Sequence, residues 1–212
     1  MRPRPSQRTY NVEYYARNRD LELQRVRVRQ AGMVELLRDL RRVPCADCGG
    51  RFKPHQMDFD HRDPSTKDFN VMTGRAMLMP TWKVLAEVAK CDIVCVNCHR
   101  LRSREQHRIR ISNAMPGTSA RLDEQRAYWR RQSAMLDRLR DVPCADCGGR
   151  FDPCSMDFDH RNPHEKVARV PSMIGRAGDA RILAEVATCD IVCANCHRVR
   201  TEVRRSGLAG RE

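Results

Sequence analysis

The chain carries the same unit twice, and this repeat constrains its fold more than any other feature. Residues 41–64 (RRVPCADCGGRFKPHQMDFDHRDP) match residues 140–163 (RDVPCADCGGRFDPCSMDFDHRNP) at an offset of 99. Residues 85–103 match residues 183–201 at an offset of 98, so the second copy lacks one residue in its middle. Such self-similarity indicates two structural units of about 60 residues each, hereafter copy one and copy two.

The composition favours small modules that need a crosslink. Of the 212 residues, 41% are hydrophobic and 5% are aromatic, which favours two modest cores over one large core. Small modules with weak cores are stabilised by disulfides or by metal ions. The net charge of +13 makes a polyanion the expected partner, and a merely solubilising charged surface is the alternative.

The cysteines favour metal binding over disulfides. No apolar stretch follows the N-terminal letters MRPRPSQRTY, and no apolar run is long enough to cross a membrane. We therefore expect a cytoplasmic protein without a membrane partner. Thiols stay reduced in that compartment, so clusters among the eleven cysteines indicate metal sites.

Cys-X-X-Cys pairs occur twice in each copy, and their members are Cys45, Cys48, Cys95, Cys98, Cys144, Cys147, Cys193 and Cys196. A two-residue spacing lets one tight turn direct both thiolates at one ion, and two such pairs complete a tetrahedral Zn²⁺ shell at ~2.3 Å per zinc–sulfur bond. Gly49 and Gly148 suit the tight turn of the first pair. A closed shell predicts one structural zinc in each copy, hence two per chain. Buried unliganded cysteines or redox pairs are the alternatives.

Three cysteines lie outside these pairs. Cys91 and Cys189 precede the second pair by four residues, and we interpret them as small buried hydrophobic residues, with ligand exchange as the alternative. We interpret Cys154 as incidental, because copy one has His55 at that position.

Hydrophobic periodicity predicts the same elements around and within both copies. Ahead of each copy, apolar residues such as Met33, Leu37 and Leu136 recur at helical spacing. Within each copy, MDFDH alternates as a half-buried strand does, so Asp60 and His61 point to opposite faces. In chain order we expect helices over 10–40, 82–90, 121–140 and 181–188, strands at MDFDH and DIVC, and a basic helix from each NCHR segment onward.

An Asp-His pair and a Cys-His pair recur in both copies. The residues concerned are Asp60, His61 and His99 in copy one and Asp159, His160 and His197 in copy two. Carboxylate oxygens and imidazole nitrogens suit a divalent cation such as Mg²⁺, Mn²⁺ or Zn²⁺. A second imidazole with a pKa near neutrality suits a general base that activates water. Structural histidines or additional zinc ligands are the alternatives.

The segments CADCGG, MDFDHR and CDIVCVNCHRLRS together resemble the zinc-containing HNH endonucleases of the ββα-metal family, which are common in bacteriophages. The resemblance covers residues 43–104 and 142–202, about 120 of the 212 residues. It implies a ββα finger beside a Cys₄ zinc and hydrolysis of phosphodiester bonds, usually in DNA. A phage-encoded protein would act in the host cell cytoplasm. The resemblance also implies general bases at His61 and His160, and a catalytic divalent cation held by Asp60 with His99 and by Asp159 with His197.

The chain departs from this family at one position in each copy. Many members have an asparagine about five residues before the second cysteine pair, where this chain has Lys90 and Thr188. The nearby asparagines are Asn97 and Asn195, inside the second pairs. We predict that they support the catalytic base instead, with capping of the final helix as the alternative.

Basic residues recur beside these motifs, at Arg62, Lys67, Arg100, Arg161, Lys166 and Arg198. Cationic side chains bind phosphate and stabilise the negative charge of a transition state. We therefore predict phosphate contacts for them, with double-stranded DNA as the partner. Ordinary solvated charge is the alternative for each one.

We expect an α+β fold of two tandem ββα-metal (treble-clef-like) zinc modules, each preceded by a basic α-helix. The expected segments are a basic helical stretch 1–42, a zinc module 43–110, a linker and connecting helix 111–141, a zinc module 142–205 and a tail 206–212. The expected function is that of a metal-dependent DNA endonuclease with two HNH-like sites in one chain, which is compatible with a monomer and leaves the oligomeric state open. A non-catalytic, zinc-stabilised nucleic-acid-binding protein is the alternative. A chain in which one copy cuts and the other only binds is a further one.

Overall fold

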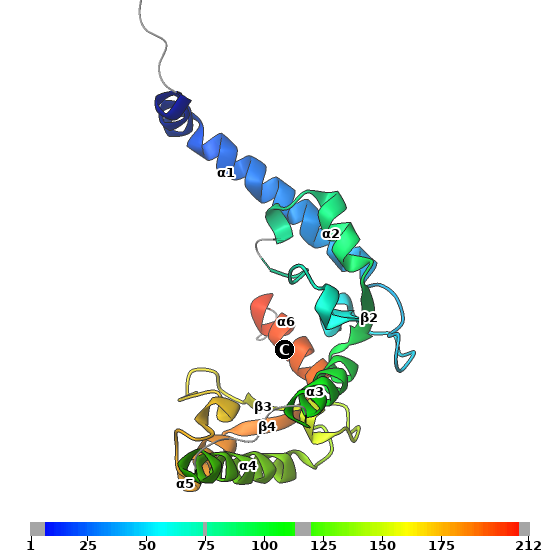
Figure 1. Cartoon of the computed structure of the whole chain (residues 1–212), viewed down its shortest axis with the longest axis vertical. Helices are drawn as coiled ribbons and strands as arrows, with labels where there is room; N and C mark the ends of the chain where they lie inside the picture. Colours follow the sequence, from blue (N-terminus) through cyan, green and yellow to red (C-terminus); the bar gives the residue numbers. More distant parts are fainter. Residues whose placement is uncertain (1–6, 74–75, 113–119, 208–212) are drawn as a thin grey trace, which may run out of the picture. The chain divides into compact units, whose positions relative to one another are not determined.

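A computed structural model describes residues 7–73, 76–112 and 120–207 of the protein. The fold is mixed α/β, with helices that accompany two small sheets of two strands each (Figure 1). This confirms the expected combination of helices and strands. Residues 113–119 of the predicted linker and 208–212 of the predicted tail lie outside the described residues. Across the described part of the chain, every helix is too short or too polar to cross a membrane.

By their contacts the residues fall into two compact units. The first unit comprises Met1–Val43 and Phe59–Ile93, and the second comprises Pro44–Asp58 and Val94–Glu212. The second unit therefore holds the cysteine pairs of copy one together with all of copy two. This division differs from the boundaries that the repeat predicts, since it passes through copy one.

A long helix packs into the first unit by its C-terminal half. Helix α1 (Gln7–Leu40) buries Met33 and Leu37 against Val84 of α2 (Thr81–Val88) (Figure 1). Helical spacing places the two α1 residues on one face, which gives this half of the helix an apolar stripe. The N-terminal half is mostly exposed where its side chains are described.

The second unit has a corresponding helix with a corresponding core. Helix α4 (Ala120–Arg140) buries Leu136 against Ile182 of α5 (Asp179–Val186) and against Met173. Leu136 stands 99 positions after Leu37, and both side chains are fully buried. The helices ahead of the two copies therefore make their core contact through leucines at equivalent positions.

One buried polar residue distinguishes α4 from α1. Gln132 is fully buried, and its amide nitrogen donates hydrogen bonds to the carbonyl oxygen of Ala177 and to Asp179 Oδ1, each at 2.9 Å. Its Oε1 accepts a hydrogen bond from the backbone N–H of Gly175 at 2.8 Å. The equivalent position in α1 is Met33, which packs against apolar side chains instead. A buried amide is stable here because its donors and acceptor are satisfied.

The predicted strands form one small sheet in each copy. Their bounds are β1 (Met57–His61), β2 (Cys91–Cys95), β3 (Met156–His160) and β4 (Cys189–Cys193). Strand β1 pairs with β2, and β3 pairs with β4. The β3–β4 pair is antiparallel, with Met156 opposite Cys193 and His160 opposite Cys189. The described residues also contain the 3₁₀ turns η1 (Pro54–Gln56), η2 (Pro64–Thr66), η3 (Ala76–Leu78), η4 (Pro153–Ser155) and η5 (Val170–Met173).

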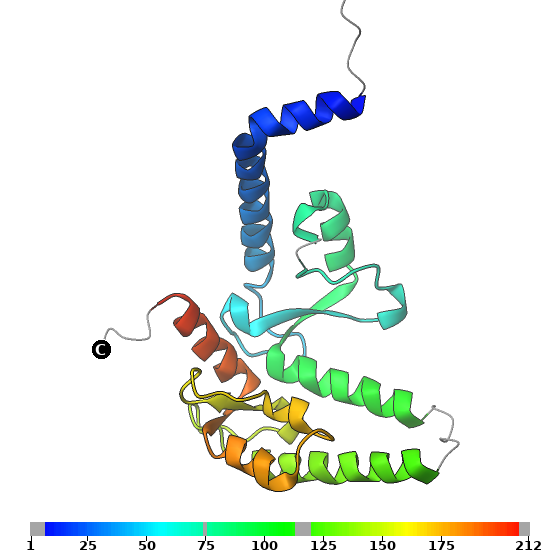
Figure 2. The same cartoon turned by 90° about the vertical axis from the view of Figure 1, so that its left-hand side faces the viewer.

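The predicted basic helices begin directly after the second strand of each sheet. They are α3 (Val96–Ser112) and α6 (Ala194–Arg205), and their N-terminal ends lie close together within the second unit (Figure 2). Cys193 is the N-cap of α6, and its sulfur accepts a hydrogen bond from the backbone N–H of Cys196 at 3.4 Å. A cysteine sulfur thus satisfies one of the unpaired N–H groups at the start of the helix.

We expect Leu37→Ala to lower the free energy of unfolding by about 3 kcal/mol, because it removes a fully buried side chain and leaves a cavity. Leu21→Ala on the same helix is the matched control, because Leu21 is 45% exposed. That change should stay within about 0.5 kcal/mol. Chemical denaturation of the zinc-loaded chain, followed by circular dichroism, measures both. Equal losses for the two variants would contradict the packing of α1.

Candidate functional site

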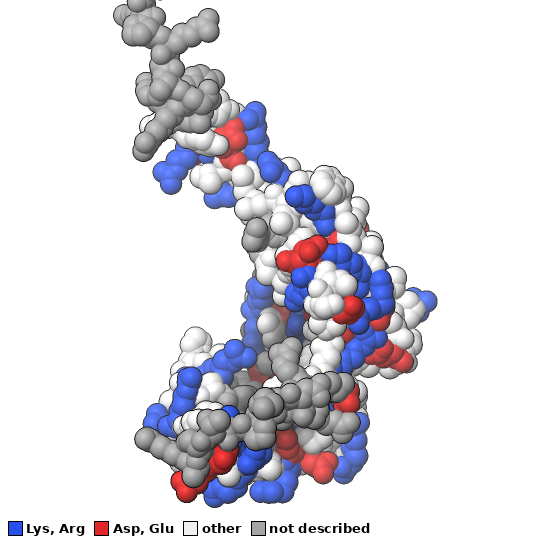
Figure 3. All heavy atoms as spheres, in the orientation of Figure 1, with Lys and Arg blue, Asp and Glu red and all other residues white. Residues whose placement is uncertain are grey.

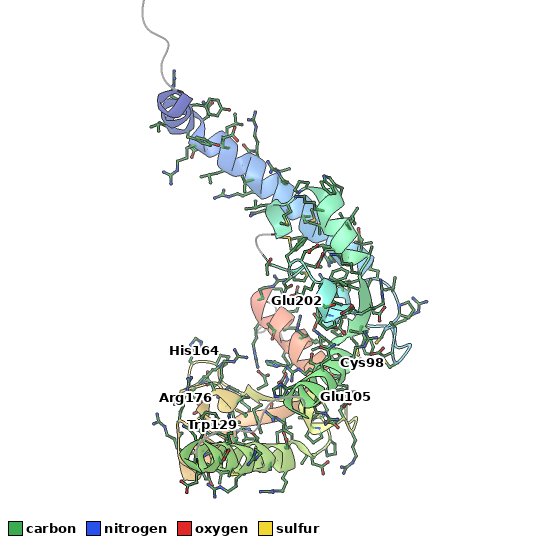
Figure 4. All side chains as sticks on the ribbon, in the orientation of Figure 1. Cys98, Glu105, Trp129, His164, Arg176 and Glu202 are labelled. Atoms are coloured by element: carbon green, nitrogen blue, oxygen red, sulfur yellow. The ribbon has the colours of Figure 1, made fainter. Side chains whose placement is uncertain are left out.

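Two tetra-cysteine groups could each hold a metal ion. They consist of Cys45, Cys48, Cys95 and Cys98, and of Cys144, Cys147, Cys193 and Cys196. The four sulfur atoms of each group lie within 4.8 Å of one another. Sulfur atoms around a tetrahedral zinc are roughly 3.8 Å apart, so both groups fit this ion. Cys98 lies near the N-terminal end of α3 (Figure 4).

The backbone of the first pair is folded as the spacing predicts. In copy one the backbone N–H of Gly49 donates to the carbonyl oxygen of Cys45 at 2.9 Å, and copy two repeats this contact at 2.9 Å between Gly148 and Cys144. Both glycines have φ of +69°, a left-handed conformation that favours glycine. The predicted role of these glycines in the tight turn is confirmed.

Backbone N–H groups favour the thiolate form of the first cysteine in each group. The N–H of Cys95 donates to Cys45 Sγ at 3.2 Å, and the N–H of Cys193 donates to Cys144 Sγ at 3.1 Å. Burial acts to raise the pKa of Cys45 and Cys144, but the N–H groups directed at each sulfur outweigh it and lower both pKa values to about 7. Thiolates are the form that binds metal.

Cys91 and Cys189 lie outside both groups among the described residues, as predicted. Both are buried, and each thiol donates to a backbone carbonyl oxygen, that of Glu87 or Glu185, at 3.4 Å. Burial raises the pKa of Cys91 to about 11. Both cysteines therefore act as small buried residues with a protonated thiol.

In copy two, one histidine contacts two aspartates of the same strand. His197 Nδ1 lies 2.8 Å from Asp157 Oδ2, and His197 Nε2 lies 3.4 Å from Asp159 Oδ1. Asp157 and Asp159 are two residues apart on β3, so they share one face of the sheet. His197 comes one residue after Cys196, so the second cysteine pair fixes where the imidazole stands. Asp159 is 4% exposed and His197 is 35% exposed, so the pair meets solvent along the histidine.

Two arginines of α6 also contact Asp159. Arg204 donates from Nη1 to Oδ1 and from Nη2 to Oδ2, both at 2.8 Å, and Arg200 Nη1 lies 3.1 Å from Oδ2. Burial acts to raise the pKa of Asp159, but the two arginines and His197 outweigh it and lower this pKa. The carboxylate is therefore ionised at neutral pH and surrounded by cationic groups.

On the opposite face of the strand, His160 meets a glutamate that sequence reasoning missed. His160 Nε2 lies 2.7 Å from Glu185 Oε1, and both side chains are buried. Oε1 also accepts hydrogen bonds from the backbone N–H groups of Val167 and Ala168. Burial acts to raise the pKa of Glu185, but these N–H groups and His160 outweigh it and lower the pKa. An ionised glutamate therefore orients the imidazole.

The first unit contains the same contact in copy one. His61 Nε2 lies 2.7 Å from Glu87 Oε1, and Lys90 Nζ lies 2.7 Å from Glu87 Oε2. Burial acts to raise the pKa of Glu87, but Lys90, His61 and two backbone N–H groups outweigh it and lower this pKa to about 2. The signal for these glutamates was present in the sequence, because both copies carry LAEVA, an acidic residue inside an apolar helical segment.

The predicted site residues are brought together most completely in copy two. There Asp159, His160 and His197 all belong to the second unit. In copy one, Asp60 and His61 belong to the first unit. His99 belongs to the second unit, where its Nδ1 lies 2.9 Å from Asp58 Oδ2. Sequence reasoning also missed Asp58 and its counterpart in copy two as partners of these histidines.

Asn97 and Asn195, predicted to support the catalytic bases, contact each other within the second unit. Both are buried, and the backbone N–H of Asn195 donates to Asn97 Oδ1 at 3.1 Å, so the Asn97 side chain makes a contact between the copies that the sequence did not predict. At the positions where the family has asparagine, Lys90 pairs with Glu87, and Thr188 Oγ1 donates to a backbone carbonyl oxygen at 2.8 Å. Helix geometry explains the difference, because the asparagines open α3 and α6, where these two helices meet.

The arginines predicted to bind phosphate are engaged within the protein. Arg62 and Arg161 each donate to a backbone carbonyl oxygen, that of Cys91 at 2.8 Å or that of Cys189 at 2.7 Å. Arg100 and Arg198 pair with aspartates Asp157 and Asp58, whereas Lys67 and Lys166 are exposed. On the face shown in Figure 3, Lys and Arg are interspersed with Asp and Glu. Arg62, Arg161 and Arg198 are also exposed, so a phosphate could reach them only in competition with these contacts within the protein.

Comparisons with protein-family models, with curated proteins and with solved structures found no match to this chain.

We expect the purified chain to contain two zinc ions, and Cys48→Ser and Cys147→Ser each to remove one of them, because each group loses a ligand. Cys154→Ser is the matched control and should keep both ions, because Cys154 belongs to neither group. Elemental analysis after exhaustive dialysis measures the stoichiometry. Full zinc occupancy in the Cys48→Ser/Cys147→Ser double variant would exclude these cysteines as ligands.

Proposed function

We propose that the chain is a metal-dependent endonuclease that hydrolyses phosphodiester bonds of double-stranded DNA, with a ββα-metal (treble-clef-like) site in each copy. One observation carries this proposal. In copy two, a histidine and an aspartate approach each other on one face of β3, while a glutamate orients a second histidine on the other face. A ligand pair for a cation beside an oriented base is what hydrolysis of a phosphodiester requires.

The pair Asp159 and His197 fits a divalent cation. Two ligand atoms at ~2.1 Å from one cation lie roughly 3.0–3.4 Å apart, and His197 Nε2 and Asp159 Oδ1 are separated by 3.4 Å. The contact between His197 Nδ1 and Asp157 holds the ring as the outer carboxylate of a metal-bound histidine does. A bound cation would polarise the phosphoryl oxygen and stabilise its developing charge.

The contact between His160 and Glu185 fits a general base. The ionised Glu185 accepts a hydrogen bond from Nε2–H, which leaves the lone pair on Nδ1 of His160 to accept a proton from water. The same reasoning applies to His61 with Glu87 in copy one. Each copy would thus supply an imidazole whose tautomer the glutamate selects, and a metal bound by the tetra-cysteine group would stabilise the cysteine turns beside the second strand.

Cleavage of supercoiled plasmid with Mg²⁺ or Mn²⁺ tests this proposal. We expect His61→Ala and His160→Ala each to slow cutting by one copy about 10²–10⁴-fold, because each removes a general base. Either single variant should accumulate nicked circles, and the double variant should lose both activities. His164→Ala is the matched control, since His164 is exposed on the loop after β3 (Figure 4).

Zinc content must stay at the wild-type level in all of these variants. If the zinc-loaded wild-type chain binds DNA and never nicks it, the chain is a non-catalytic DNA-binding protein and not a nuclease. A double variant that still cuts at the full rate would exclude the two histidines as bases.

The copies differ at the position of an arginine that contacts Asp159. Arg204, which contacts both oxygens of Asp159, corresponds in the repeat to Gln106. A cation that binds Asp159 therefore has to displace a guanidinium group in copy two. Glutamine carries no charge, so the sequence of copy one lacks the cation that copy two has at this position.

We expect Arg204→Gln to tighten Mn²⁺ binding to copy two by about tenfold, because it removes a charge-assisted hydrogen bond from the ligand carboxylate. Titration of Mn²⁺ followed by electron paramagnetic resonance measures this in the His99→Ala background, which lacks the expected ligand of copy one. Arg205→Gln is the matched control, since Arg205 pairs with Glu202 and is 75% exposed. Unchanged or weaker binding in Arg204→Gln would exclude the competition.

A further inference from the structure

Equivalent asparagines of the two copies exchange hydrogen bonds inside the second unit. The backbone N–H of Asn195 donates to Asn97 Oδ1 at 3.1 Å, and the backbone N–H of Asn97 donates to Asn195 Oδ1 at 3.4 Å. Both residues are buried. An exchange of the same contact between the same positions is what a two-fold interface produces in a homodimer. Here both partners belong to one chain.

A second pair of contacts repeats this symmetry around the asparagines. Gln56 Nε2 donates to the carbonyl oxygen of Asn195 at 3.1 Å, and Ser155 Oγ donates to the carbonyl oxygen of Asn97 at 3.0 Å. Gln56 and Ser155 occupy equivalent positions, 99 residues apart. The chemistry of the side chain differs between the copies, but the contact that it makes is the same.

A third pair of contacts connects this interface to the histidines. Arg100 of copy one donates from Nη1 to Asp157 Oδ1 at 2.6 Å and from Nη2 to Asp157 Oδ2 at 2.8 Å. Asp157 in turn holds Nδ1 of His197 in its own copy at 2.8 Å. A bidentate guanidinium fixes the plane of a carboxylate, which a single hydrogen bond does not.

The equivalent contact in the other direction is also present, with longer distances. Arg198 of copy two lies 3.3 Å and 3.4 Å from the two oxygens of Asp58, which holds Nδ1 of His99 at 2.9 Å. The Arg198 side chain is 44% exposed, compared with 35% for Arg100. The same line of arginine, aspartate and histidine therefore crosses the interface in both directions, with tighter geometry toward copy two.

We propose that Arg100 and Arg198 are positioning residues that act across the interface, so that each copy holds the metal-binding histidine of the other. This inference rests on the proposed function. Without Arg100, Asp157 could rotate about its own side-chain bonds, and His197 would lose its fixed orientation toward Asp159. With both arginines in place, the second unit would act as one composite unit in which each copy depends on the other.

The test uses backgrounds in which one copy cuts. His61→Ala leaves copy two as the cutting copy, and His160→Ala leaves copy one. We expect Arg100→Gln to lower the nicking kcat about tenfold in the His61→Ala background and to change it less than about twofold in the His160→Ala background. Arg198→Gln should show the reverse pattern with a smaller factor, because its contacts are longer.

Arg104→Gln is the matched control. Arg104 lies on the same helix as Arg100 and also contacts an aspartate of copy two, Asp152, which holds no histidine. Both Arg100→Gln and Arg104→Gln therefore remove a contact between the copies. Only Arg100→Gln removes the contact to the aspartate that holds His197. Arg100→Lys should recover part of the rate, because it keeps the charge but not the bidentate geometry.

A second readout does not depend on cleavage. We expect the ring nitrogen signals of His197, followed by nitrogen-15 NMR and assigned with His197→Gln, to shift in Arg100→Gln and to stay in place in Arg104→Gln. This comparison decides the inference even in a chain that does not nick DNA, so failure of the proposed function is distinguishable. Equal loss of cutting by both copies in Arg100→Gln, or His197 signals that match the wild type, would overturn the inference.

Discussion

One hydrogen bond joins the parts of each copy on which the rest of the structure depends. The backbone N–H at the end of the second strand donates to the first cysteine sulfur, from Cys95 to Cys45 in copy one and from Cys193 to Cys144 in copy two. This contact ties the first cysteine turn to the strand end at the point where the basic helix begins. A metal held by the four sulfurs would strengthen the same junction, since structural zinc contributes its binding energy to folding. This junction therefore sets the position of the histidine that follows the last cysteine.

The strand between the two cysteine pairs then separates two kinds of polar contact. On β3, Asp157 and Asp159 share the face that meets His197, while His160 lies on the other face and meets Glu185. The alternation of MDFDH predicted one solvated face, yet Asp159 and His160 are both buried. Buried charged groups persist only when they are paired. The ends of this short strand are therefore held by ion pairs and hydrogen bonds as much as by apolar packing.

Duplication within one chain gives these contacts a second level of organisation. Asn97 and Asn195 lie at the start of equivalent helices, and the side-chain oxygen of each accepts a hydrogen bond from the backbone N–H of the other. Arg100 and Arg198 extend outward from this centre to the aspartates of the opposite copy. A covalent link between two such partners raises their effective concentration, so a polar interface of this kind can persist without a large apolar surface.

The sequence by itself determined the repeat, the cysteine groups, the glycine turns and the order of helices and strands, because these depend on spacing and on local periodicity. It also contained LAEVA, although nothing in a linear pattern showed that Glu87 and Glu185 reach His61 and His160. Only the tertiary structure decided which carboxylate holds which histidine. It also turned the predicted phosphate-binding Arg100 toward Asp157. The physical reason is that these are pairings between charged groups 25 to 57 residues apart, which strand register and helix packing set and which no local rule encodes.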